Sequence, residues 1–264
     1  HNYFYGKKPN VEHALASLEG GASTIFKEID KTGCLPSPQS LEHLTMVLHI
    51  LTQYARTTYI AEATNEMTDK IMKHLTESKA VAEGIDLNDI RIGIEDPARY
   101  ALSIAVPLHP ILLDMDYKLL LNFSGEQLIT SDNPVVFYNQ FFSFRKHLSN
   151  TGFACKGLQI FFPLDHEKLI LLYDHDVYEI GSPGKAIVKI IDRRDIYSLN
   201  TLQICSASDN VYFRCSDIDF AALRKKATPF LRDHKITMNS IPQKEKDGNR
   251  SELIVTSNVD IRTN

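Results

Sequence analysis

The residues best suited to chemistry lie in one short string, Ser131-Asp132-Asn133-Pro134, between two apolar stretches. A carboxylate beside a hydroxyl and an amide at the end of a strand can coordinate a cation or position a water molecule. The structural alternative is a turn in which these side chains bond to their own backbone before the proline. One carboxylate cannot hold a divalent metal alone, so Asp132 would need partners from elsewhere in the chain.

Three further polar residues recur on one side of a predicted helix. Gln53 and Arg56 are three residues apart and His49 lies one turn earlier, so the three side chains project from one face. This face either lines a polar cavity or is exposed to solvent, and the sequence leaves both interpretations open. In the first case Gln53 and Arg56 are candidate catalytic residues, with Arg56 stabilising a developing phosphate charge. His49 is then a candidate ligand-binding residue, together with Ser131 and Asn133.

Glu19 interrupts a small and apolar stretch, Leu18-Glu19-Gly20-Gly21-Ala22, whose glycine pair permits the close approach of another backbone. We expect Glu19 to form an ion pair with Arg56 across two helices, and such a pair is more often structural than catalytic. As a catalytic group, Glu19 would join Asp132 as a base or as a ligand to a divalent metal, which is the candidate cofactor.

The spacing of apolar residues predicts helices in the first half of the chain and strands in the second. Steps of three and four residues predict helices over 11–30, 38–55 and 59–78, and Asp96-Pro97 predicts the start of a shorter one. Short apolar runs typical of strands follow at 118–123, 127–130, 135–138, 158–162 and 169–173. Helices are again expected at 192–207 and 218–231. Ser124-Gly125 predicts a tight turn that joins the first two strands as a hairpin.

This order predicts an α+β fold in which a helical N-terminal half packs on a mixed or antiparallel sheet from the C-terminal half. The helical subregion is 10–116, the strand-rich subregion is 117–231, and 232–264 is a polar tail. Within this tail we expect 242–249 to form a loop or linker, and Leu253-Ile254-Val255 is a candidate final strand. The length of 264 residues leaves one domain or two open. We predict one domain over 1–264.

Charge and motif content argue against several classes of function. The formal net charge of -4 argues against a protein that binds nucleic acid through net positive charge, although a local basic groove stays open. Arg193-Arg194 and Arg224-Lys225-Lys226 are short basic stretches that indicate exposed helix faces, and Asp165-His166-Glu167-Lys168 indicates a charged turn. The sequence contains no P-loop, dinucleotide-binding, serine-hydrolase, zincin or EF-hand motif.

Cysteine use and hydropathy predict the compartment. The four cysteines are far apart in the sequence and indicate isolated thiols in a reducing cytoplasm. No apolar run approaches the roughly 18 residues of a membrane span, so we expect no membrane partner. The first residues have neither a starting Met nor a signal peptide, so we expect this chain to be a piece of something longer.

Several of these strings, in this order, resemble the family called domain of unknown function 4238. Its members are mostly bacterial, with some fungal ones, and the family name carries no established activity. In that family a segment resembling His-Tyr-(Val/Ile)-Pro lies upstream of the first string, so we expect a site that uses its histidine to be incomplete here. The resemblance spans roughly 2–213, and its most specific part is Ser131-Asp132-Asn133-Pro134. The strings that carry it are Asn2-Tyr3-Phe4-Tyr5, Leu18-Glu19, Gln53-Tyr54-Ala55-Arg56-Thr57, Ile129-Thr130-Ser131-Asp132-Asn133-Pro134-Val135 and Phe161-Phe162-Pro163-Leu164.

Two functional hypotheses and one structural hypothesis follow. The first is a hydrolytic, nuclease-like effector in bacterial defence or toxicity that acts on nucleic acid through Asp132, Glu19, Gln53 and Arg56. The alternative is a non-catalytic pocket that binds or senses a small anionic ligand or a nucleotide, with Arg56 as the counter-charge. The third is that the polar residues form a satisfied buried network that holds the helical half on the sheet.

Overall fold

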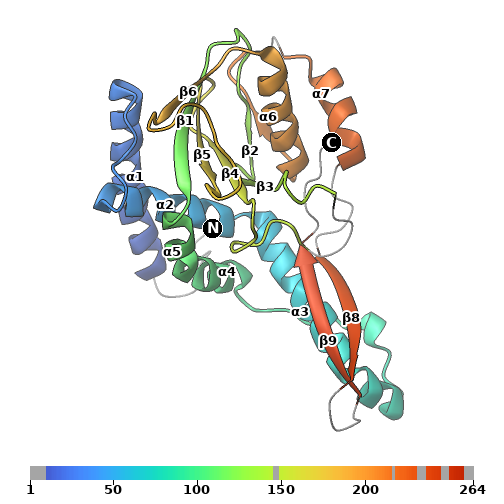
Figure 1. Cartoon of the computed structure of the whole chain (residues 1–264). Coiled ribbons are helices and arrows are strands. Elements are labelled where there is room, and N and C mark those ends of the chain that lie inside the picture. Colours follow the sequence, from blue (N-terminus) through green and yellow to red (C-terminus); the bar gives the residue numbers. More distant parts are fainter. Residues whose placement is uncertain (1–9, 145–148, 216–217, 231–235, 245–249, 259–264) are drawn as a thin grey trace.

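The computed structural model describes residues 10–144, 149–215, 218–230, 236–244 and 250–258, the last two ranges as backbone except for Ile236. Most helices precede the sheet in the chain, as the sequence predicts (Figure 1). The helices are α1 (Asn10–Thr32), α2 (Leu41–Ala55), α3 (Thr58–Glu83), η1 (Leu87–Asp89), α4 (Pro97–Ala105), η2 (Val106–Leu108), α5 (His109–Leu113), α6 (Arg193–Ser206), α7 (Phe220–Ala227) and η3 (Thr228–Phe230). In the part of the chain that the structure describes, none of these helices has the length and apolar content to cross a bilayer.

Five strands form one mixed sheet in the order β3-β4-β5-β1-β6. Antiparallel pairing joins β3 to β4, β4 to β5 and β5 to β1, whereas β6 runs parallel to β1 at the edge. The prediction of an α+β fold with a mixed sheet from the C-terminal half is therefore confirmed. The strands are β1 (Asp116–Asn122), β2 (Thr130–Ser131), β3 (Val136–Tyr138), β4 (Gln159–Pro163), β5 (Lys168–Tyr173), β6 (Ile187–Ile190), β7 (Val211–Tyr212), β8 (Ile236–Lys244) and β9 (Arg250–Asn258).

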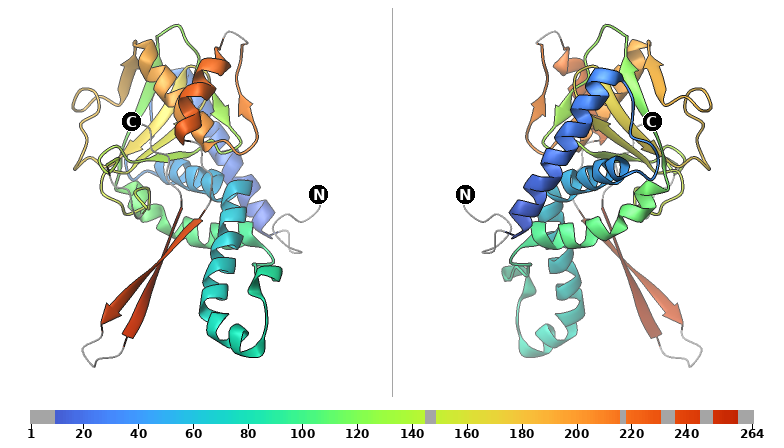
Figure 2. Two further views of the ribbon diagram at one scale, coloured as in Figure 1. Left: turned by 90° about the vertical axis from the view of Figure 1, so that its right-hand side faces the viewer. Right: turned by 90° about the vertical axis from the view of Figure 1, so that its left-hand side faces the viewer.

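Helices cover both faces of this sheet. Neighbouring residues of a strand point to opposite faces, so each strand contributes side chains to both helical layers. Ile170 packs into a core shared with α1, α2 and α5, while Leu171 beside it packs into a core shared with α6 and α7. Burying such a side chain contributes about 2 kcal/mol relative to leaving it in water. Figure 2 shows α6 and α7 on the far side of the sheet from α1. The sheet thus separates two helical layers, one formed by α1, α2 and α5 and the other by α6 and α7.

Local capping explains where the helices begin. The Ser40 hydroxyl accepts a hydrogen bond from the His43 N–H at 3.1 Å, so α2 begins at Leu41, later than the predicted start at 38. Asp96 caps α4 by accepting from the Arg99 N–H, as Asp96-Pro97 predicts.

The predicted hairpin around Ser124-Gly125 does not form. β2 pairs with β7, far along the chain, and not with β1. The turn itself is present, because the Asn122 side chain accepts from the Ser124 N–H and donates to the Glu126 carbonyl. The turn therefore redirects the chain toward a long-range partner that the local pattern does not reveal.

The C-terminal segment contains more strand than the sequence predicts, and the candidate strand Leu253-Ile254-Val255 lies within β9. β8 and β9 form an antiparallel two-stranded ladder over Ile236–Lys244 and Arg250–Asn258. This hairpin contacts α3, and both project away from the sheet (Figure 1) and diverge from one another in Figure 2. Lys70 on α3 donates to the Ile236 carbonyl at 2.7 Å and ties the two together.

Candidate functional site

Asp132 lies directly after β2 and closes a turn that follows α6. One carboxylate oxygen accepts from the Ser208 N–H at 2.9 Å, and the other accepts from the N–H groups of Asp209 and Asn210 at 2.8 and 3.0 Å. Three backbone donors at the end of a helix are thereby satisfied by one side chain. Both oxygens of Asp132 are occupied by backbone contacts.

Ser131 and Asn133 extend the same network into the protein interior, and both are buried. The Ser131 hydroxyl lies 3.0 Å from Gln203 Oε1, and it accepts from the Asn133 N–H. Asn133 Nδ2 donates to the Ser206 carbonyl at 2.8 Å and to Ser208 Oγ at 3.0 Å. The string Ser131-Asp132-Asn133 therefore fixes the C-terminal end of α6, a helix of the strand-rich subregion, whereas the third hypothesis expected a network that holds the N-terminal helical half on the sheet.

The other four candidates come together where α1 and α2 pack. Glu19 and Arg56 form an ion pair between the two helices, as their sequence context predicts. One turn of α2 away, Gln53 Nε2 lies 3.3 Å from His49 Nε2. The structure thus joins Glu19, His49, Gln53 and Arg56 in one cluster.

A cleft of about 350 Å³ opens beside this cluster. Glu19 and His49 line it, and neither Asp132 nor its neighbours Ser131 and Asn133 do. We call it the α1–α2 cleft, and its lining residues are Glu19, Ser23, Phe26, Lys27, Asp30, His49, Leu164, Asp165 and Lys168.

His49 is the most unusual group of the cleft because it is polar, 8% exposed and incompletely bonded. Its ring makes edge contacts with Phe26 and Phe162. Nδ1 is buried without a hydrogen-bond partner among the residues that the structure describes. Burial first, and then the nearby Arg56 charge, lower the pKa of His49 to about 4, although the Glu19 charge opposes the shift. The imidazole is therefore neutral at pH 7.

Lys168 closes the opposite wall and is a residue that sequence analysis missed. Its ammonium group donates to Asp30 on α1 at 2.7 Å and to Asp165 in the β4–β5 turn at 3.1 Å. These hydrogen bonds, the one to Asp30 first, raise the pKa of Lys168 against the effect of burial. The sequence signal was the charged turn Asp165-His166-Glu167-Lys168, but nothing local indicated that it packs against α1.

Lys27 lines the same cleft and was also missed by sequence analysis. Among the described residues it has neither a carboxylate nor a hydrogen-bond partner, whereas Arg56 and Lys168 are both neutralised. In the described ranges no group of three or more His, Cys, Asp and Glu side chains is placed to hold a metal ion. The cleft therefore offers a lysine without an ion-pair partner among the described residues and a buried neutral imidazole, in a lining that also carries the carboxylates of Glu19, Asp30 and Asp165.

A comparison with family models matches residues 1–217 to a protein family of unknown function, DUF4238. The chain belongs to the DUF4238 family. In this DUF4238 protein the match covers the α1–α2 cleft, the sheet and α6, whereas the β8–β9 hairpin lies beyond it. Comparisons with curated proteins and with solved structures gave no match.

Proposed function

We propose that this DUF4238 protein binds a small anionic ligand in the α1–α2 cleft, without breaking a bond in it. The observation that carries the proposal is His49 Nδ1, a buried polar atom that lacks a hydrogen bond beside a cleft. Leaving such an atom unsatisfied costs about 1–3 kcal/mol, so a ligand that bonds to it recovers stabilisation that the protein alone lacks. A volume of 350 Å³ lies within the usual range for small-molecule sites.

The hydrogen-bond arrangement indicates the charge of the ligand. When the Gln53 amide donates to His49 Nε2, the imidazole proton sits on Nδ1, which then offers an N–H to an acceptor. Nδ1 is enclosed, so binding includes a rotation of the ring toward the cleft. Lys27 supplies the positive charge, since Arg56 and Lys168 already face carboxylates. A carboxylate or phosphate oxygen satisfies both groups.

The same contacts favour binding over hydrolysis. The hydrolytic hypothesis needs Asp132 as a metal ligand or base, but both of its oxygens accept backbone N–H groups and it does not line the cleft. A general base works best with a pKa near the operating pH, and His49 lies about three units lower. We therefore assign Ser131, Asp132 and Asn133 a structural role in this proposal.

Calorimetric titration of the full chain tests the proposal, with inorganic phosphate, succinate and AMP as probes. We expect at least one probe to bind, and His49→Phe to weaken it about tenfold, the equivalent of one hydrogen bond to a charged group. Phe keeps the ring contacts with Phe26 and Phe162 and removes both nitrogens. Lys27→Gln should weaken binding similarly.

Two matched variants serve as controls. His43→Phe changes another buried histidine of α2, and Lys31→Gln changes a lysine one turn along α1, but neither residue lines the cleft. Both should bind the probe as the wild type does. If no probe binds, or if His49→Phe and His43→Phe bind equally, the proposal is wrong.

A further inference from the structure

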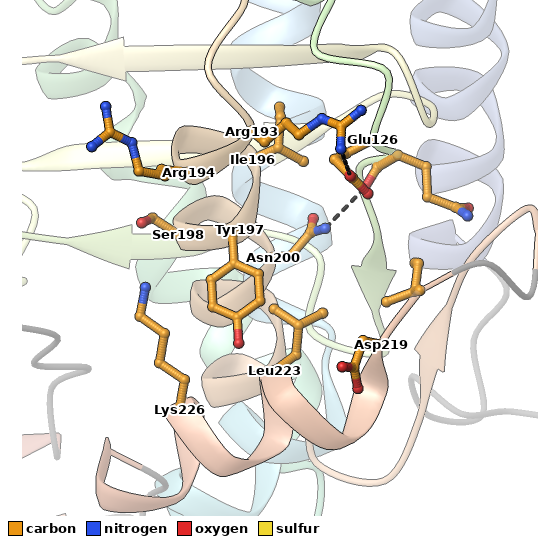
Figure 3. A pocket seen from close by; sticks show the side chains of 12 residues that line it. Glu126, Arg193, Arg194, Ile196, Tyr197, Ser198, Asn200, Asp219, Leu223 and Lys226 are labelled. Atoms are coloured by element: carbon orange, nitrogen blue, oxygen red, sulfur yellow. Dashed lines mark hydrogen bonds and ion pairs between the residues drawn. The ribbon is translucent and has the colours of Figure 1, made fainter.

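A second pocket of about 530 Å³ opens between α6 and α7, on the other side of the sheet (Figures 1 and 3). It is larger than the α1–α2 cleft and shares no lining residue with it. Its walls include Arg193, Arg194, Tyr197, Ile218, Leu223 and Lys226. Two basic stretches that the sequence presents as separate exposed helix faces thus meet at one cavity.

The three cations of this pocket are not equally neutralised. Asp192 holds Arg194 through two short contacts, at 2.9 Å from Nε and 2.6 Å from Nη2. Arg193 lies 3.5 Å from Glu126, beyond good hydrogen-bond distance, with 72% of its side chain exposed. Such an exposed pair contributes at most about 1 kcal/mol. Arg193 can therefore turn to another anion at little cost.

Lys226 has no carboxylate partner among the described residues. Its ammonium group lies 4.8 Å from the centre of the Tyr197 ring, a cation–π contact. In Figure 3, Lys226 extends from α7 along one side of Tyr197, whereas the Arg193 guanidinium at the start of α6 is turned toward Glu126. The pocket lining therefore includes two cations, Arg193 and Lys226, that no short carboxylate contact holds among the described residues.

The floor between these cations is apolar. Leu223 and Ile196 are buried beneath it, and Ile218 and Tyr197 are partly buried at its sides. An aliphatic or aromatic surface placed there is removed from water, which contributes roughly 25 cal/mol for each Å². The pocket thus combines an apolar floor with a charged lining in which Arg193, Arg194 and Lys226 outnumber the carboxylates of Glu126 and Asp219.

We propose that the α6–α7 pocket binds an organic phosphate. Its phosphate group lies between Arg193 and Lys226, and its apolar or aromatic body packs on Tyr197, Ile218 and Leu223. A doubly charged anion matches two available cations, and the arginine guanidinium suits phosphate oxygens through parallel N–H donors. The assignment is independent of the ligand proposed for the α1–α2 cleft.

Titration calorimetry with four probes tests this site on the full chain. Phenyl phosphate and AMP carry both a phosphate and a ring. Inorganic phosphate is the anion without a ring, and adenosine has a ring system without phosphate. We expect phenyl phosphate or AMP to bind, and the two partial probes to bind at least about tenfold more weakly. Lys226→Gln should weaken the organic phosphate about tenfold, equivalent to one charge-assisted contact. Lys225→Gln, its exposed neighbour outside the pocket lining, should leave binding unchanged.

Every other outcome overturns the assignment. Absence of binding by both organic phosphates removes the site. Equal weakening of organic-phosphate binding by Lys226→Gln and Lys225→Gln shows only diffuse electrostatic attraction. The same conclusion follows if inorganic phosphate binds as tightly as the organic phosphates. Loss of binding in His49→Phe with full binding in Lys226→Gln places the ligand in the α1–α2 cleft instead. Thermal midpoints within one degree of wild type confirm that each variant is folded.

Discussion

Two polar regions of this protein use similar residue types in opposite ways. The string Ser131-Asp132-Asn133 satisfies its oxygens and its amide with backbone and side-chain groups around the end of α6. The α1–α2 cleft leaves His49 Nδ1 unpaired and Lys27 without a counter-charge. Residue type alone favoured Asp132 as the chemical centre, whereas the hydrogen-bond inventory favours His49. A polar residue with spare bonding capacity beside a cavity is the better candidate for ligand binding.

The largest expected effect concerns His49 and pH. Its folded-state pKa is about 4 against an ordinary value of 6.5, so between these pH values the unfolded chain binds the additional proton. Stability from this group is complete above pH 6.5 and is lost as the pH falls toward 4, by about 3 kcal/mol in total. In urea unfolding at several pH values, the free energy of unfolding should fall between pH 6.5 and pH 4 by about 3 kcal/mol less in His49→Phe than in the wild type. Identical pH profiles of the two chains would contradict the buried neutral imidazole.

The next effect concerns the string after β2. Asp132→Ala removes the acceptor of three backbone N–H groups and should lower the free energy of unfolding by about 2 kcal/mol, because water replaces part of the loss. Asp209→Ala removes an exposed carboxylate from the same turn and should change stability by less than about 0.5 kcal/mol. Urea denaturation of both variants measures the difference. Equal stability of the two variants would place Asp132 outside the structural network.

The smallest effect concerns the ion pair that joins the two helices of the cleft. Glu19 and Arg56 are each more than a quarter exposed, so a double-mutant cycle with Glu19→Gln and Arg56→Gln should give a coupling of at most about 1 kcal/mol. The coupling should shrink as salt is added. A coupling of several kcal/mol that persists at high salt would instead indicate a buried catalytic pair.

Sequence periodicity predicted the layers of the fold well because it reports which residues face a core. The helical stripes, the strands around Leu119 and Ile170, and the cap at Asp96 all follow from local pattern. Pairing of β2 with β7 could not be predicted, since a strand of two residues has no pattern that selects its partner. β8 was missed because its polar composition resembles that of a loop, whereas the apolar run Leu253-Ile254-Val255 indicated part of β9.

Only part of the candidate site could be predicted, because local sequence patterns do not report contacts between distant parts of the chain. Helical spacing placed His49, Gln53 and Arg56 on one face, and the glycine pair beside Glu19 indicated where a second helix approaches. Whether that face met solvent or a cavity depended on Lys168, which reaches α1 from a turn more than a hundred residues away in sequence. Arg193 and Lys226 were likewise interpreted as solvated, because only the tertiary structure brings them to the lining of one pocket.

Side-by-side calorimetry of Asp132→Ala and His49→Phe, using whichever anionic probe the wild type binds, distinguishes a ligand site at His49 from one at Asp132. Asp132→Ala should bind the probe as wild type does, although it unfolds at lower urea concentration. His49→Phe should keep its stability at pH 7, because an unpaired buried nitrogen is replaced by carbon, and should lose about tenfold in affinity. The reverse pattern, with binding lost in Asp132→Ala and kept in His49→Phe, would contradict the account.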